Sequence, residues 1–143
     1  MQKALIIYDS YSGNTEKMAK SLREGLASGS VEVDTTLKSI DNTTKEDLLD
    51  ANIILFGAPT RMANLPSKTK EFLDGIDASV VKGKVGASFG SCGGTCESIP
   101  MITGKLKSLE MNVVEPGLKV QGRPRGIDLE RCRDFGKGIV DKL

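Results

Sequence analysis

Short apolar runs alternate with amphipathic stretches along the whole chain. The run 4–8 is apolar throughout, the run 51–57 is apolar except for Asn52, and both are bounded by turn-forming residues. Runs of this length and composition predict strands that are buried on both faces of a sheet. Three weaker strands are predicted at 31–36, at 83–90 and at 113–120, the last of them interrupted at Pro116-Gly117.

Helical periodicity fills the segments between these runs. Met18, Ala19, Leu22 and Leu26 form one apolar face of a first helix, which is predicted to end around Gly25 to Gly29. Further helices are predicted in four places: a short one capped by Thr43-Thr44, one that begins at Pro66-Ser67, one over 97–111, and a last one from 129 to 140 after a turn at 124–129.

The alternation of strands and helices predicts one α/β domain over residues 1–143. Five strands of this kind form a parallel sheet covered by helices on both faces, a three-layer α/β/α sandwich. We expect the strand order 2-1-3-4-5, which places ligands at the switch between strands 1 and 3. The loops 9–15, 58–65 and 91–96 then leave the same edge of the sheet and converge on one crevice.

The loop after the first strand has the composition of an anion site. It supplies small residues and hydroxyls directly before a helix, where unpaired N–H groups and a partial positive charge favour a phosphate. The same residues also suit ordinary helix capping in any α/β protein, so spacing alone leaves both interpretations open. The residues of this loop are Ser10, Tyr11, Ser12, Gly13, Asn14 and Thr15.

Composition narrows the chemistry. The chain of 143 residues has no histidine, a net charge of +1 and three cysteines. Without histidine there is no imidazole for a metal or for a Ser or Cys hydrolase, so we interpret the G-x-S-x-G match at 86–90 as chance and expect no catalytic residue and no metal. The odd cysteine count indicates reduced thiols. The N-terminal residues lead directly into the first strand without a signal-peptide pattern, from which we expect a cytoplasmic protein. The charge indicates no nucleic-acid partner, and no apolar stretch has the length for membrane insertion.

The motif Ser10-x-Ser12-Gly13-x-Thr15 after an N-terminal strand resembles the phosphate loop of the flavodoxin family. Nearly the whole chain is similar to the flavodoxin-like domain of A-type flavoproteins, the flavodiiron proteins. The segments that carry this likeness are 8–10, 15–19, 57–60, 65–67, 89–91, 115–117 and 124–132. The di-iron domain of those proteins has no counterpart here, which implies a free-standing flavodoxin.

The resemblance implies non-covalently bound FMN and a low-potential electron carrier. The phosphate would lie on residues 10–15 and the isoalloxazine ring between two further loops. The implied partners are redox proteins, either ferredoxin-like or flavoenzyme donors and acceptors, and the implied state is a monomer or a weak dimer. The ring loops would contribute Pro59, Thr60, Arg61, Met62, Ala63 and Asn64, and Ser91, Cys92, Gly93, Gly94, Thr95 and Cys96.

The loop after strand 4 departs from the flavodiiron pattern. Its aromatic positions correspond here to Cys92 and Gly94, and the chain has no tryptophan. Our hypothesis is that Tyr11, Met62 or Arg61 covers part of the ring instead. Each also has an ordinary interpretation: an exposed loop tyrosine, a loop-packing methionine, a solvated surface arginine. Cys92 would be redox-relevant if it lies near the flavin, whereas as an unpartnered thiol it would be a small loop filler.

Two other functions stay open on the same fold. An FMN-dependent NAD(P)H or quinone reductase would need a substrate pocket over the flavin. A flavin-free interaction module would be consistent with the missing aromatic residues.

Overall fold

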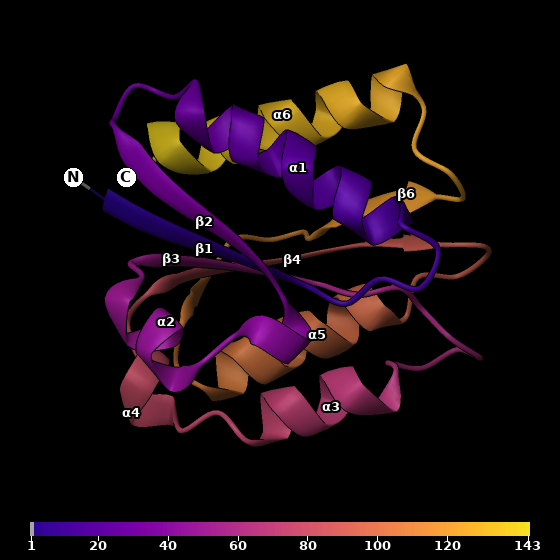
Figure 1. Cartoon of the computed structure of the whole chain (residues 1–143), viewed down its shortest axis with the longest axis horizontal. Helices are drawn as coiled ribbons and strands as arrows, with labels where there is room; N and C mark the ends of the chain where they lie inside the picture. The colour runs from indigo at the N-terminus through magenta and orange to yellow at the C-terminus, as the bar shows by residue number, and fades with distance from the viewer. Residues whose placement is uncertain (1) are drawn as a thin grey trace.

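The computed structural model describes residues 2–143, which form a parallel sheet between two layers of helices (Figure 1). The strands are β1 (Gln2–Tyr8), β2 (Val33–Ser39), β3 (Ile53–Gly57), β4 (Val85–Cys92), β5 (Asn112–Val113) and β6 (Leu118–Gln121). Their order is β2-β1-β3-β4-β5, with β6 also paired to β4. The predicted three-layer architecture and strand order are therefore confirmed.

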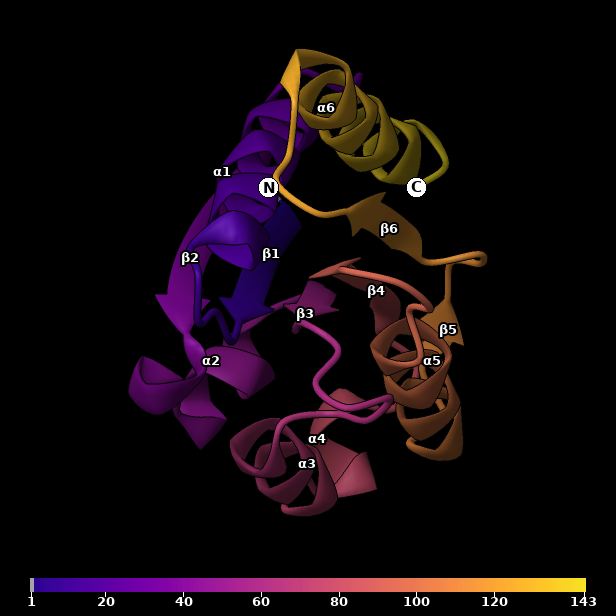
Figure 2. The same ribbon diagram turned by 90° about the vertical axis from the view of Figure 1, so that its right-hand side faces the viewer.

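The helices divide between the two faces of the sheet. They are α1 (Asn14–Ala27), η1 (Ile40–Asn42), α2 (Lys45–Asp50), α3 (Ser67–Asp74), α4 (Ala78–Val81), α5 (Ser98–Ser108) and α6 (Gly126–Asp141). Helices α1 and α6 lie side by side on one face, and α2 to α5 cover the other (Figures 1 and 2).

The central strands owe their position to apolar side chains on both faces. In β1, Leu5 and Ile7 belong to the core beneath α2 to α5, whereas Ala4 and Ile6 belong to the core beneath α1 and α6. All five residues of β3 are buried. Because successive side chains of a strand point to opposite faces, only a run without polar positions can fill both cores.

The predicted fifth strand is divided into two. β5 pairs with Val85 and Gly86 at the start of β4, and β6 pairs with the stretch from Phe89 to Cys92 at its end. Pro116 lies between the two segments, and proline cannot donate the hydrogen bond that a continuous ladder would require. The sheet consequently has six strands rather than the predicted five.

The first helix ends at Ala27, inside the predicted range of Gly25 to Gly29, and Gly25 itself lies within the helix. A Cβ atom on Gly25 would collide with the backbone of Arg133, and one on Gly136 would lie 2.6 Å from the carbonyl oxygen of Leu22. The two glycines let α1 and α6 approach closely. A packing requirement, rather than a helix stop, explains Gly25.

Several further boundaries differ from the predictions; β3 and α5, for example, are shorter than the predicted 51–57 and 97–111. β2 covers 33–39 rather than 31–36, and β4 continues to Cys92, so Ser91 and Cys92 are strand residues. The last helix begins at Gly126 rather than at 129, because the Asp128 carboxylate accepts a hydrogen bond from the backbone N–H of Arg125 at 2.9 Å. Such a bond caps the first turn of a helix. Within residues 2–143, no helix is long and apolar enough to cross a membrane.

Candidate functional site

The loops after β1, β3 and β4 leave the C-terminal edge of the sheet together, and this edge faces the viewer in Figure 2. Side-chain contacts join them. Thr15 at the start of α1 lies 3.5 Å from Ser91 at the end of β4, measured between the hydroxyl oxygens. Thr60 of the second loop donates to the Ser98 hydroxyl at 2.9 Å. Residues far apart in the sequence thus form one continuous site.

The first loop turns sharply at Gly13, whose φ of 86° lies in the left-handed region. Glycine adopts this conformation without the steric cost that a Cβ atom brings. The backbone N–H of Gly13 donates to the Ser10 hydroxyl at 3.1 Å, which holds the loop closed. The helix behind it has no side-chain cap, so its first N–H groups point out of the helix end.

Thr15 is the buried member of this loop, with 1% of its surface exposed. Its contact with Ser91 is at the long limit for a hydrogen bond between hydroxyls. Ser91 is itself buried. The Thr15 hydroxyl is therefore fixed in position and only weakly satisfied by its neighbour.

Asp9 was not among the predicted site residues, yet it anchors the first loop. Its carboxylate is 6% exposed and accepts a hydrogen bond from the Thr69 hydroxyl of α3 at 2.6 Å. A polar residue directly after a buried strand was the available sequence signal. Its partner, sixty residues later, could not be identified from the sequence.

Ser98 was also missed by the sequence analysis. Its hydroxyl donates to the carbonyl oxygen of Ala58 at 3.2 Å, and its backbone N–H donates to the Thr60 hydroxyl at 3.0 Å. These bonds attach the start of α5 to the loop after β3. They fix Pro59 and Thr60 next to the sheet edge.

The second loop ends in a tight two-residue turn. Arg61 and Asn64 exchange backbone hydrogen bonds at 2.8 and 2.9 Å across Met62 and Ala63. Met62 and Ala63 both have positive φ, 50° and 60°, which is uncommon for residues with a side chain. The Met62 side chain is 99% exposed at the tip of the turn. The turn holds it away from the protein core.

Arg61 bridges the first and second loops. Its guanidinium carbon lies 4.4 Å from the centroid of the Tyr11 ring, a cation–π contact. Tyr11 is itself 57% exposed. The pair forms a wall between the two loops, so neither residue is an isolated surface side chain.

The third loop contains a correction to the expected cysteine chemistry. Cys92 and Cys96 form a disulfide, with their Cα atoms 5.4 Å apart, so the prediction of reduced thiols is wrong for these two residues. Cys132 is the free cysteine among residues 2–143, and its burial raises the pKa of its thiol to about 11. Gly93 and Gly94, between the paired cysteines, are exposed, and the Thr95 hydroxyl donates to the Glu97 carboxylate.

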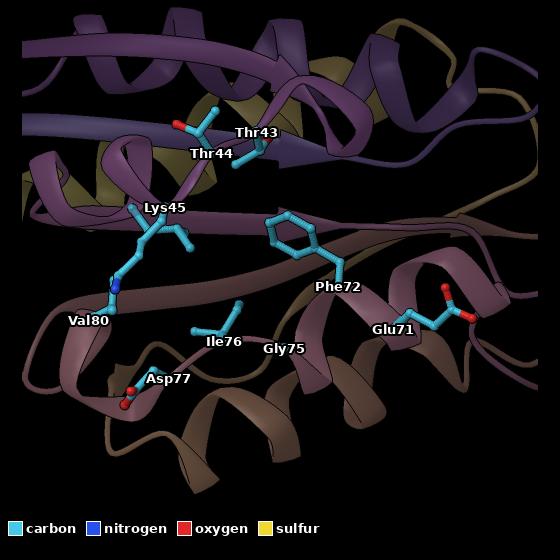
Figure 3. A pocket seen from close by; sticks show the side chains of 10 residues that line it. Thr43, Thr44, Lys45, Glu71, Phe72, Gly75, Ile76, Asp77 and Val80 are labelled. Carbon is cyan, nitrogen blue, oxygen red and sulfur yellow. The ribbon is translucent and has the colours of Figure 1, made fainter.

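Two other features contribute nothing to this site. Ser88 of the G-x-S-x-G match is fully buried and shares a 2.7 Å hydrogen bond with Thr103, so no substrate reaches it. A hollow of about 370 Å³ lies among α2, α3 and α4, where Phe72, Ile76 and Val80 line it, away from the three loops (Figure 3). In the described part of the chain, no three acidic or cysteine side chains are grouped to hold a metal ion.

Comparison with known proteins gives a consistent result. The flavodoxin family model matches residues 6–136. A flavodoxin from Aquifex aeolicus is 32% identical over 161 residues, covering 99% of this chain and 86% of that protein. A nitric oxide reductase from Moorella thermoacetica is 35% identical over 144 residues, covering 99% of this chain. The chain spans only 36% of the reductase's length.

The fold comparison agrees with the sequence comparison. A solved flavodoxin from the domain Archaea superposes with a TM-score of 0.93 at 31% identity, covering 99% of this chain and 98% of that one.

Proposed function

The chain belongs to the flavodoxin family, and on that basis we propose that it is an electron carrier that holds FMN non-covalently at the edge where its three loops meet. When bound, FMN supplies the electron chemistry, one or two electrons at a time. The protein residues then need only to bind, orient and shield it. A carrier of this kind requires no side-chain acid or base, in agreement with a chain that has no histidine.

The observation that carries this proposal is the donor set at the start of α1. The backbone N–H groups of Asn14, Thr15 and Glu16 have no acceptor within residues 2–143. The hydroxyls of Ser10, Ser12 and Thr15 belong to the same turn. A phosphate dianion fits this set of donors, because it offers several acceptors to a helix end with a partial positive charge.

The strength of such a phosphate site comes from uncharged donors. Between residues 9 and 15 there is no lysine or arginine. Hydrogen bonds from N–H and O–H groups to a charged acceptor contribute roughly 1.5–3 kcal/mol each. A few of them suffice for tight binding without a positively charged side chain in the loop.

For the flavin ring we propose the space between the turn at 59–64 and the loop at 91–96. The Tyr11–Arg61 pair, together with the exposed Met62, would cover the flavin ring. These side chains would take the place of the aromatic residues that related proteins have in the loop after β4. The buried contact between Thr15 and Ser91 would hold the phosphate and ring regions at a fixed separation.

We propose that redox proteins, ferredoxin-like or flavoenzyme donors and acceptors, dock over this same edge. Tyr11 and Met62 are the large exposed apolar side chains there, and exposed apolar side chains favour protein contacts. Residues 1–143 would form one FMN-binding unit. The cytoplasmic location and the monomeric or weakly dimeric state stay predictions from the sequence.

The test is a visible absorption spectrum of the purified protein, recorded before and after addition of excess FMN and desalting. Flavin bands that stay with the protein support the proposal, and a blank spectrum in both cases contradicts it. Steady turnover of NAD(P)H with an added acceptor, in the absence of any partner protein, would instead indicate the reductase alternative.

A further inference from the structure

The Cys92–Cys96 disulfide lies in the loop that the proposed function assigns to the flavin ring. It closes a ring of backbone around Gly93, Gly94 and Thr95 at the end of β4. Neither the flavodoxin fold nor the electron-carrier function requires a disulfide at this place. Its effect must therefore be sought in what it does to the loop.

The loop has few other restraints. The Gln121 side-chain amide donates to the carbonyl oxygen of Gly94 at 3.1 Å. The backbone N–H of Gly122 donates to the carbonyl oxygen of Cys92 at 2.7 Å. A Cβ atom built on Gly93 or on Gly94 would meet nothing within 4 Å. Glycine loses more conformational freedom on ordering than any other residue. The disulfide is thus the main restraint on the Gly93-Gly94 pair.

The two sulfur atoms differ in accessibility. Cys92 is 6% exposed, and its sulfur lies 3.8 Å from the carbonyl oxygen of Val120. Cys96 is half-buried and borders an open groove of about 720 Å³, which Ile99, Pro116 and Lys119 also line. A reductant can approach Cys96 from the groove, whereas Cys92 is shielded by β6.

The exchange step follows the usual chemistry of thiolates. A thiolate of an external dithiol attacks the sulfur of Cys96, and the Cys96–Cys92 bond breaks with the electron pair leaving on Cys92. The second thiol of the dithiol then releases Cys96 and closes the reductant's own disulfide. The protein gains two electrons and two protons, and the Cys92 thiol can donate to the carbonyl oxygen of Val120.

We propose that this disulfide is a reversible switch on flavin affinity. A dithiol reductant opens it at Cys96, and the opened loop holds FMN more weakly than the closed one. This inference rests on the proposed function, since it presupposes that the loop contacts FMN. The protein would then bind its cofactor according to the thiol–disulfide balance around it.

The first measurement counts thiols. Protein equilibrated at a series of dithiothreitol ratios is alkylated after acid quenching and denaturation, and its mass is measured. We expect one modified cysteine, Cys132, under oxidising conditions and three under reducing conditions, with the last two appearing together. With glutathione, the mixed disulfide should form on Cys96. Three free thiols under every condition would overturn the proposal.

The second measurement is the Kd of FMN for oxidised and reduced apoprotein, from quenching of flavin fluorescence. We expect reduction to weaken binding roughly tenfold, as ordering two freed glycines requires. The double variant Cys92→Ser/Cys96→Ser should bind weakly under both conditions, while Cys132→Ala keeps the response. Equal Kd values within twofold, in wild-type protein with a proven change in thiol count, would overturn the switch and leave the flavin site intact. Failure to bind FMN in either state would overturn the proposed function as well.

Discussion

Thr15 offers the sharpest test of the phosphate site, because Thr15→Val removes a hydroxyl while keeping the shape of the side chain. The hydroxyl is buried and has only the 3.5 Å contact with Ser91. Losing so long a contact between neutral groups should cost the apoprotein less than about 1 kcal/mol. In the holoprotein the same hydroxyl would donate to a phosphate oxygen, a bond of roughly 1.5–3 kcal/mol. The Kd of FMN should therefore rise by about 10- to 150-fold.

The assay is a fluorescence titration with FMN and, in parallel, with riboflavin, which has the same ring but no phosphate. Thr15→Val should weaken FMN binding and leave riboflavin binding nearly unchanged. An equal loss for both ligands would refute the reasoning, because the hydroxyl would then act on the ring or on the fold.

A matched control replaces Thr35 with valine. The Thr35 hydroxyl on β2 is buried and has no hydrogen-bond partner within residues 2–143. Removing it relieves the cost of an unsatisfied polar group, so Thr35→Val should stabilise the apoprotein by about 1 kcal/mol. FMN binding should not change. The same threonine-to-valine substitution should therefore weaken FMN binding at position 15, whereas at position 35 it should leave binding unchanged and stabilise the apoprotein.

Three further predictions concern the other loops and the last helix. Arg61→Ala removes the cation held over Tyr11. In a potentiometric titration, this variant should lower the potential of the second flavin reduction step by roughly 40 mV, the equivalent of about 1 kcal/mol. An unchanged potential would place Arg61 outside the ring site. Ala63→Gly relieves a φ of 60° and should raise the free energy of unfolding by about 1 kcal/mol in urea melts, whereas a loss would show that the turn is not strained. The hydrogen bond from the backbone of Arg125 lowers the pKa of Asp128 below its ordinary 3.8. The ionised carboxylate therefore stabilises the fold above pH 4, and this contribution is lost as the pH falls through the lowered pKa. Asp128→Asn should make the free energy of unfolding less dependent on pH in this acid range, and an unchanged dependence would count against the cap.

The sequence was sufficient to predict those structural features that depend on residues within a single element. The stretch 53–57 has no polar side chain, and a buried central strand is the fold element that such a run can form. The strand, turn and helix around residues 10–15 were likewise predictable, because Gly13 and the hydroxyls define the turn locally.

The remaining features depend on contacts between distant segments. The packing role of Gly25 was not predictable, because its neighbours in the sequence do not show that α6 approaches it closely. The turn at Met62 and Ala63 lacks the Asn-Gly signal of such turns, and Arg61 and Asn64 stabilise it through their backbone hydrogen bonds. The spacing of Cys92 and Cys96 does not predict a disulfide, which forms because β4 and the loop bring the two side chains together.

The most direct test of the central claim is a backbone amide NMR spectrum of the ¹⁵N-labelled apoprotein, titrated with FMN and then with riboflavin. FMN should shift the amides of residues 13–16 together with those of 60–64 and 91–96, and riboflavin should shift only the last two groups. Shifts confined to the residues around the hollow among α2, α3 and α4, or no shift at 13–16 with FMN, would contradict the account.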